Sequence, residues 1–217
     1  MSPAGSQPTT RVVLGTIIVV LALSLLIAGW FIPFTFESFS ILYKFGMEKT
    51  LLRSGKVIGV TIAVLVFYQI LLASRFAIFE QVFSAKRLLS LHRINGLAIT
   101  FLVISHPLLI KASENFTPYT FEKKYYPEFL GMAVLAVLLT LSLTAVFRKF
   151  FKFSYSRWRL RHRMVATLAL FLIPIHILFV SDTFKAGIPR NAALFIFSLN
   201  LLMITRIWLL RLLQKAG

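Results

Sequence analysis

The stretch that decides the fold is Leu91 to Ile110, LHRINGLAITFLVISHPLLI, which is echoed by RHRMVATLALFLIPIHILFV at Arg161 to Val180. Each stretch is apolar over about 20 residues, the length of a helix that crosses a hydrocarbon core about 30 Å thick. Each begins with a His-Arg pair and carries a second histidine fourteen residues later. The chain has four histidines, and all of them lie here: His92, His106, His162 and His176.

The fourteen-residue spacing has a geometric meaning. At about 1.5 Å per residue, the two histidines of one helix lie roughly 21 Å apart along its axis. At about 100° per residue, fourteen steps return to nearly the same face of the helix. Two such helices in parallel would oppose their imidazoles at two depths of the membrane, and a facing pair of neutral imidazoles is the axial ligand set of a haem iron. A zinc site wants about four ligands, and no Cys, Asp or Glu lies nearby in the sequence to complete one.

A small residue follows the first histidine of each helix by one turn: Gly96 after His92, and Ala166 after His162. One interpretation is that these residues leave room for a flat macrocycle against the helix. The other is that they serve close helix packing in lipid, where small residues are common.

The composition is that of a membrane protein with several spans. The chain has 217 residues, a mean hydropathy of +0.83 and 58% hydrophobic residues. It has no cysteine, which excludes disulfides, iron–sulfur clusters and thiolate haem ligation. Its net charge of +17 does not require a nucleic-acid partner, because cytoplasmic loops of membrane proteins collect Lys and Arg.

Hydropathy predicts a disordered tail over residues 1–10 and a six-helix membrane domain over residues 11–217. The expected spans are 12–34, 57–79, 89–111, 128–147, 160–181 and 191–213, with a polar loop over 35–55. The third and fifth spans carry the histidines. One span separates them, so they cross the membrane in the same direction.

The charge pattern predicts the orientation. Six spans put both termini on one side, and that side carries 15 of the 24 Lys and Arg residues. The positive-inside rule then places both termini in the cytoplasm, and we expect a bacterial plasma membrane. All seven carboxylates lie in loops or at span ends, which disfavours a proton pump or metal carrier, since such proteins need acidic groups along their path.

Four arginines are further candidates for cofactor binding. Arg93, Arg161 and Arg163 neighbour the cytoplasmic histidines and could neutralise haem propionates, although ordinary positive-inside flanking explains them equally well. Arg206 is embedded in the sixth span. A charge there needs a partner or must extend to the interface.

The two histidine helices resemble the ferric reductase-like transmembrane domain, the family that ferric-chelate reductases and NADPH oxidases share. The residues that carry the resemblance are Leu91-His92-Arg93, Gly96, His106-Pro107, Trp158-Arg159, His162-Arg163 and His176. The resemblance implies an all-α, six-helix bundle that holds two stacked b-type haems between its third and fifth helices. His92 and His162 would be the inner pair of ligands, and His106 and His176 the outer pair.

The implied function is transmembrane electron transfer to an acceptor such as ferric iron or oxygen on the outer face. In the family a cytoplasmic domain with FAD or FMN and NAD(P)H supplies the electrons. No Gly-rich dinucleotide turn occurs here, so we expect these cofactors on a missing domain or on a partner subunit. An alternative is a haem membrane subunit that serves a methionine sulfoxide reductase. A histidine-based transporter and a structural membrane anchor are less favoured, and a haem absorption spectrum would separate both from an electron carrier.

Overall fold

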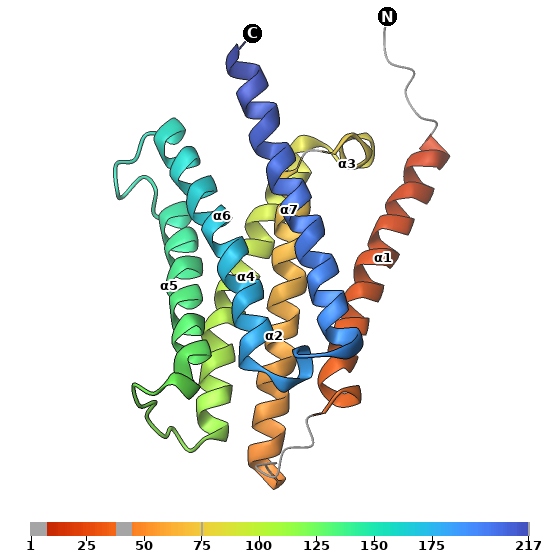
Figure 1. Ribbon diagram of the computed structural model, residues 1–217. Coiled ribbons are helices and arrows are strands. Elements are labelled where there is room, and N and C mark those ends of the chain that lie inside the picture. Colours follow the sequence, from red (N-terminus) through yellow and green to blue (C-terminus); the bar gives the residue numbers. More distant parts are fainter. Residues whose placement is uncertain (1–7, 38–44, 75, 217) are drawn as a thin grey trace, which may run out of the picture.

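The structure, a computed structural model, describes residues 8–37, 45–74 and 76–216 (Figure 1). Residues 1–7 of the expected tail lie outside the described residues, as do Lys44 and Arg75. Residues 8–10, which were also expected in the tail, are already helical.

The described residues form six long helices. They are α1 (Pro8–Thr35), α2 (Gly46–Ala73), α4 (Ala85–Ser113), α5 (Tyr126–Val146), α6 (Tyr155–Val180) and α7 (Gly187–Ala216). A short helix α3 (Ala77–Val82) follows α2, and the 3-10 turns η1 (Lys123–Tyr125) and η2 (Asp182–Phe184) precede α5 and α7. Among the described residues there is no strand, and all six long helices are long and apolar enough to cross a membrane. The predicted all-α architecture with six spans is confirmed.

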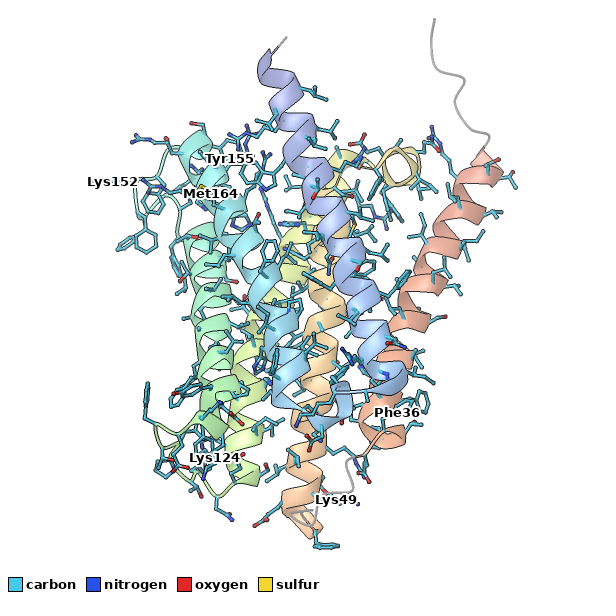
Figure 2. The ribbon with its side chains drawn as sticks, in the orientation of Figure 1. Phe36, Lys49, Lys124, Lys152, Tyr155 and Met164 are labelled. Atoms are coloured by element: carbon cyan, nitrogen blue, oxygen red, sulfur yellow. The ribbon has the colours of Figure 1, made fainter. Side chains whose placement is uncertain are left out.

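The helices stand side by side, and α1 begins at the same end of the bundle at which α7 finishes (Figure 1). We call this the termini end and the opposite one the far end. The connections at both ends carry polar side chains: Lys152 and Tyr155 lie at the termini end, and Lys49 and Lys124 at the far end (Figure 2). Polar side chains at both ends of a bundle suit helices whose middle lies in hydrocarbon. In that middle region, each helix satisfies its backbone groups by its own hydrogen bonds.

Helix packing divides the centre of the bundle into two antiparallel pairs. The helix α2 packs along α4, and α5 packs along α6. The helix α1 packs mainly against α2, and α7 packs against both α6 and α2. A single apolar core at mid-depth joins α2, α4, α5, α6 and α7, and its members include Ile62, Val66, Ile99, Val103, Leu138, Leu170, Ile173 and Met203. Many large apolar side chains point outward instead, as expected of helices that face lipid.

The second span ends earlier than predicted. The expected span ran to residue 79, but α2 stops at Ala73, and Ser74 closes it by donating from its hydroxyl to the Leu71 carbonyl at 2.7 Å. The apolar residues beyond this point form the separate helix α3. Hydropathy could not distinguish one long span from a span followed by a short helix, because both are equally apolar.

The polar loop predicted over residues 35–55 was too long. The helix α2 begins at Gly46, whose φ of 57° lies in the left-handed region that glycine adopts without strain. The charged residues Glu48, Lys49 and Arg53 therefore belong to the first turns of α2. Arg53 and Lys49 both pair with Glu37, which follows α1, so the end of α1 is tied to the start of α2.

Candidate functional site

The four histidines lie at two levels on α4 and α6. His92 and His162 are close to the termini end, and His106 and His176 are close to the far end, since both helices run away from the termini end (Figure 1). His162 lies within electrostatic range of His92, and His176 within range of His106. The structure therefore brings the histidines together as a near pair (His92 and His162) and a far pair (His106 and His176).

The two histidine helices are not closely packed against each other. Close packing joins α4 to α2 and α6 to α5. Among the described residues, α4 and α6 do not form a closely packed pair with each other. The bundle thus carries the imidazoles on α4 and α6, whose backbones are not in close contact with each other.

Backbone carbonyls hold both rings of the far pair. His106 donates from Nδ1 to the Gly55 carbonyl of α2 at 2.8 Å. His176 donates from Nδ1 to the Pro127 carbonyl of α5 at 2.9 Å. A carbonyl can only accept, so each Nδ1 carries the proton and each Nε2 keeps its lone pair. This is the tautomer that a metal-ligating histidine adopts when its other nitrogen is held by a second group.

A glycine lies against each ring of the far pair, one turn after the accepting carbonyl. A Cβ at Gly59 would come within 2.9 Å of Cε1 of His106, and a Cβ at Gly131 within 2.6 Å of Cε1 of His176. Side-chain atoms essentially never approach so closely, so any larger residue would displace the imidazole. The same pair of features, a carbonyl and a glycine four residues later, therefore seats both far histidines.

Gln69 of α2 holds the first ring of the near pair. His92 donates from Nδ1 to the Gln69 backbone carbonyl at 3.2 Å, and the Gln69 side-chain nitrogen lies 3.1 Å from Nε2 of His92. Asn95 donates to the Gln69 side-chain oxygen at 2.7 Å. A Cβ at Gly96 would lie 3.2 Å from the same amide nitrogen of Gln69. Gly96 thus belongs to the packing between α4 and α2, and its role toward a macrocycle stays a prediction.

The second ring of the near pair is held differently. Nδ1 of His162 is buried and has no hydrogen-bond partner among the described residues. The ring lies against Trp158 instead, with 5.2 Å between the ring centroids. Ala166, one turn further along α6, is half-buried. His162 is therefore positioned by packing, and among the described residues its Nδ1 is not committed to a protein partner.

The arginines proposed from the sequence occupy distinct places. Arg93 is exposed, and Arg161 lies over the Phe153 ring at 5.5 Å. Arg163 is half-buried and lies near the like charge of Arg211 on α7. Arg93 lies within electrostatic range of His92, and Arg163 within range of His162. Contact of any of the three arginines with a propionate stays a prediction.

Arg206 has found a protein partner. It donates from Nη1 to the carbonyl of Ser74 at 2.7 Å, and its guanidinium lies 4.5 Å from the centre of the Phe76 ring. Ser74 is the residue that ends α2. Arg206 therefore caps the C-terminus of α2, where the helix dipole favours a positive charge, and this capping contact accounts for an arginine in the sixth span.

The loop before α5 is organised by one tyrosine. Nζ of Lys111 lies 3.3 Å from the centre of the Tyr119 ring and 3.2 Å from Oε2 of Glu114. Burial raises the pKa of the Tyr119 phenol, and the nearby Glu114 carboxylate adds to the effect. The Tyr119 ring also contacts Phe129 edge to face at 6.4 Å. These contacts fix the start of α5, which supplies the carbonyl that holds His176.

Five residues that seat the histidines were not predicted from the sequence. They are Gly55, Gly59, Gln69, Pro127 and Gly131. A signal was present, because Gln69 follows Gly55 by fourteen residues, the same step that separates the two histidines of α4. It becomes meaningful only once α2 is known to lie antiparallel to α4.

The donor set suits a haem better than a bare metal ion. Among the described residues no group of three or more His, Asp or Glu side chains converges as a metal-ion site. The histidines come in twos, on two helices that are not closely packed together, and three of the four have Nδ1–H engaged with a backbone carbonyl, which leaves Nε2 as the nitrogen with a lone pair. Pairs of neutral imidazoles held in this way fit the two axial positions of a haem iron.

A comparison with models of protein families matches residues 58–179 to the ferric reductase like transmembrane component. The matched region begins within α2 and ends within α6, so it contains all four histidines, the whole of α4 and α5, part of α2 and nearly all of α6. No curated protein and no solved structure matches the chain.

Proposed function

Since the chain belongs to the ferric reductase-like transmembrane family, an oxidoreductase-type membrane component, we propose that it carries electrons across the bilayer through two b-type haems. The near pair would hold one haem and the far pair the other. The observation that carries the proposal is the seating of the far pair. Two equivalent carbonyls, of Gly55 and Pro127, fix Nδ1–H and leave Nε2 of both rings for a ligand.

The protein would hold each haem through two histidines and would disfavour the binding of oxygen to iron. A haem supplies one-electron redox chemistry when bound. Two histidines at each level would hold one haem iron between them, which would favour electron transfer at the haem edge over binding of oxygen to iron. The apolar core beside the histidines provides a medium of low dielectric constant.

The direction of transfer follows from the charge distribution. We propose that the termini end faces the cytoplasm, because most Lys and Arg residues gather there. A flavin and NAD(P)H reductase, whether a further domain or a separate subunit, would deliver electrons near His92 and His162. A small acceptor such as ferric iron or oxygen would receive them beyond His106 and His176.

The first experiment is a spectrum of the purified protein from haem-replete cells. We expect about two non-covalently bound b-type haems per chain, with the low-spin spectrum of two imidazole ligands after reduction by dithionite. A folded but colourless preparation would contradict the proposal.

The second experiment tests the direction across the membrane. The protein is placed in liposomes that enclose a reductant, and ferricyanide, which does not cross lipid, is added outside. We expect ferricyanide reduction in these liposomes and a large loss of it with His106→Ala, which should lack one haem. Equal rates for the two proteins would show that electrons do not pass through both sites.

A further inference from the structure

The inference concerns Gln69 and rests on the proposed function. It starts from a repeated register between neighbouring helices. On α2, Gly55 and Gln69 lie fourteen residues apart, and their carbonyls accept from His106 and His92. On α5, Pro127 accepts from His176, and fourteen residues later lies Leu141. In an antiparallel pair equal steps keep residues level with each other, so Leu141 occupies, beside His162, the place that Gln69 occupies beside His92.

Leu141 differs from the other three residues, because its carbonyl does not accept a hydrogen bond from a histidine in the described contacts. The Leu141 carbonyl accepts from the Thr144 hydroxyl at 3.3 Å, and no bond joins it to His162, whose Nδ1 is left without a partner among the described residues. Leucine also offers no side-chain amide. The two rings of the near pair therefore differ because Gln69 on one helix pair corresponds to Leu141 on the other.

Gln69 engages both nitrogens of His92. Its backbone carbonyl accepts from Nδ1, so the ligating nitrogen Nε2 is left as an acceptor. Its side-chain nitrogen, 3.1 Å away, donates to that Nε2. The same amide nitrogen also donates to the His92 backbone carbonyl at 3.0 Å.

The orientation of the amide is set by Asn95. Nδ2 of Asn95 donates to the Leu65 carbonyl at 2.9 Å and to the side-chain oxygen of Gln69 at 2.7 Å. Because the Gln69 oxygen is engaged there, its NH₂ group is directed at His92. Gly96 leaves the space that this amide occupies, since a Cβ there would lie 3.2 Å from it.

We propose that Gln69 is a positioning residue that caps the ligating nitrogen of His92 until a haem takes its place. The backbone carbonyl sets the tautomer that ligation requires, while the side chain occupies the lone pair that iron would use. The near site therefore loads its haem against an internal competitor, whereas the Nε2 atoms of the far site carry no such cap in the described contacts.

The test measures hemin binding at the near site alone. Full-length His106→Ala from haem-limited cells retains only the near pair, and hemin is titrated in with the Soret band as readout. In this background Gln69→Leu copies Leu141 and removes the cap but not the carbonyl. We expect hemin to bind about twofold to tenfold more tightly, the equivalent of one hydrogen bond that no longer has to be broken.

The reverse variant provides the matched control. Leu141→Gln places an amide level with His162, and we expect it to weaken hemin binding at the near site. His176→Ala provides a second background, should His106→Ala not fold. A purely structural Gln69 would give weaker binding or unfolding in Gln69→Leu, and unchanged or weaker binding overturns the proposal. If the wild-type chain takes up no hemin at all, the proposed function itself fails together with the role of Gln69.

Discussion

The far pair and the near pair consist of the same residue type on the same two helices, yet their surroundings differ. At the far level each ring has one carbonyl and one glycine, so that α2 and α5 treat His106 and His176 alike. At the near level Gln69 engages both nitrogens of His92, while His162 packs against the Trp158 ring and its Nδ1 has no hydrogen-bond partner among the described residues. The comparison shows that equivalent backbone carbonyls on α2 and α5 give the two far rings the same surroundings. At the near level, the change from Gln69 to Leu141 accompanies different surroundings for the two rings.

The largest expected effect is the loss of the haem at the far pair. Gly131→Ala places a methyl group 2.6 Å from Cε1 of His176, and Gly59→Ala places one 2.9 Å from His106. A rigid ring cannot give way as a flexible chain does, so each variant should lose the far haem and about half of the total haem. Haem content per protein measures this. Full haem content in both variants would show that the far rings have room that the structure does not give them.

A second prediction concerns Arg206, which lies toward the termini end but contacts neither histidine of the near pair in the described contacts. Arg206→Leu removes the cap on the Ser74 carbonyl and should lower the free energy of unfolding by about 1.5–3 kcal/mol, the range for a hydrogen bond from a charged group. The haem spectrum and potentials of the folded protein should not change, and Arg206→Lys should recover part of the stability. A shifted haem potential with unchanged stability would instead assign Arg206 to a haem.

The third prediction compares the two levels by potential. A hydrogen bond from Nδ1–H to a carbonyl makes the imidazole a stronger donor and favours ferric iron. The far pair has two such bonds and the near pair has one. The positive charge of Arg163 near His162 also favours the reduced near haem. We expect the far haem to have the lower potential, by about 20–65 mV for the one bond. A redox titration in which the far haem, identified by its loss in His106→Ala, has the higher potential would contradict this.

The smallest expected effect is a glycine substitution at the near level. Gly96→Ala brings a methyl group 3.2 Å from the Gln69 amide, which is the flexible end of a side chain. The amide can move by a few tenths of an ångström, so haem content should stay near that of the wild type, in contrast to Gly131→Ala. Loss of the near haem in Gly96→Ala would mean that the macrocycle itself requires the space at this position.

The sequence was sufficient to predict the helices and the histidines, but not what holds them. Six apolar runs and a duplicated fourteen-residue step are visible in the residue types alone. The groups that seat His106 and His176 are backbone carbonyls, which every residue carries, so no residue pattern marks them. Only the antiparallel register selects Gly55 and Pro127.

The span boundaries show a similar limit. The end of α2 at Ala73 depends on Ser74 and on its contact with Arg206, which lies more than a hundred residues away in the chain. Hydropathy averages over neighbours and cannot detect such a contact. The same averaging hid the start of α2, because its first turns are charged and paired with Glu37.

The central claim is that the histidines act as two pairs at two levels, and single-histidine variants test it most directly. The measurement is haem per protein together with a redox titration of His106→Ala, His176→Ala, His92→Ala and His162→Ala. We predict that His106→Ala and His176→Ala lose the same redox component, and that His92→Ala and His162→Ala lose the other. If His106→Ala and His162→Ala removed the same component, the pairing between α4 and α6, and the electron path drawn through it, would be wrong.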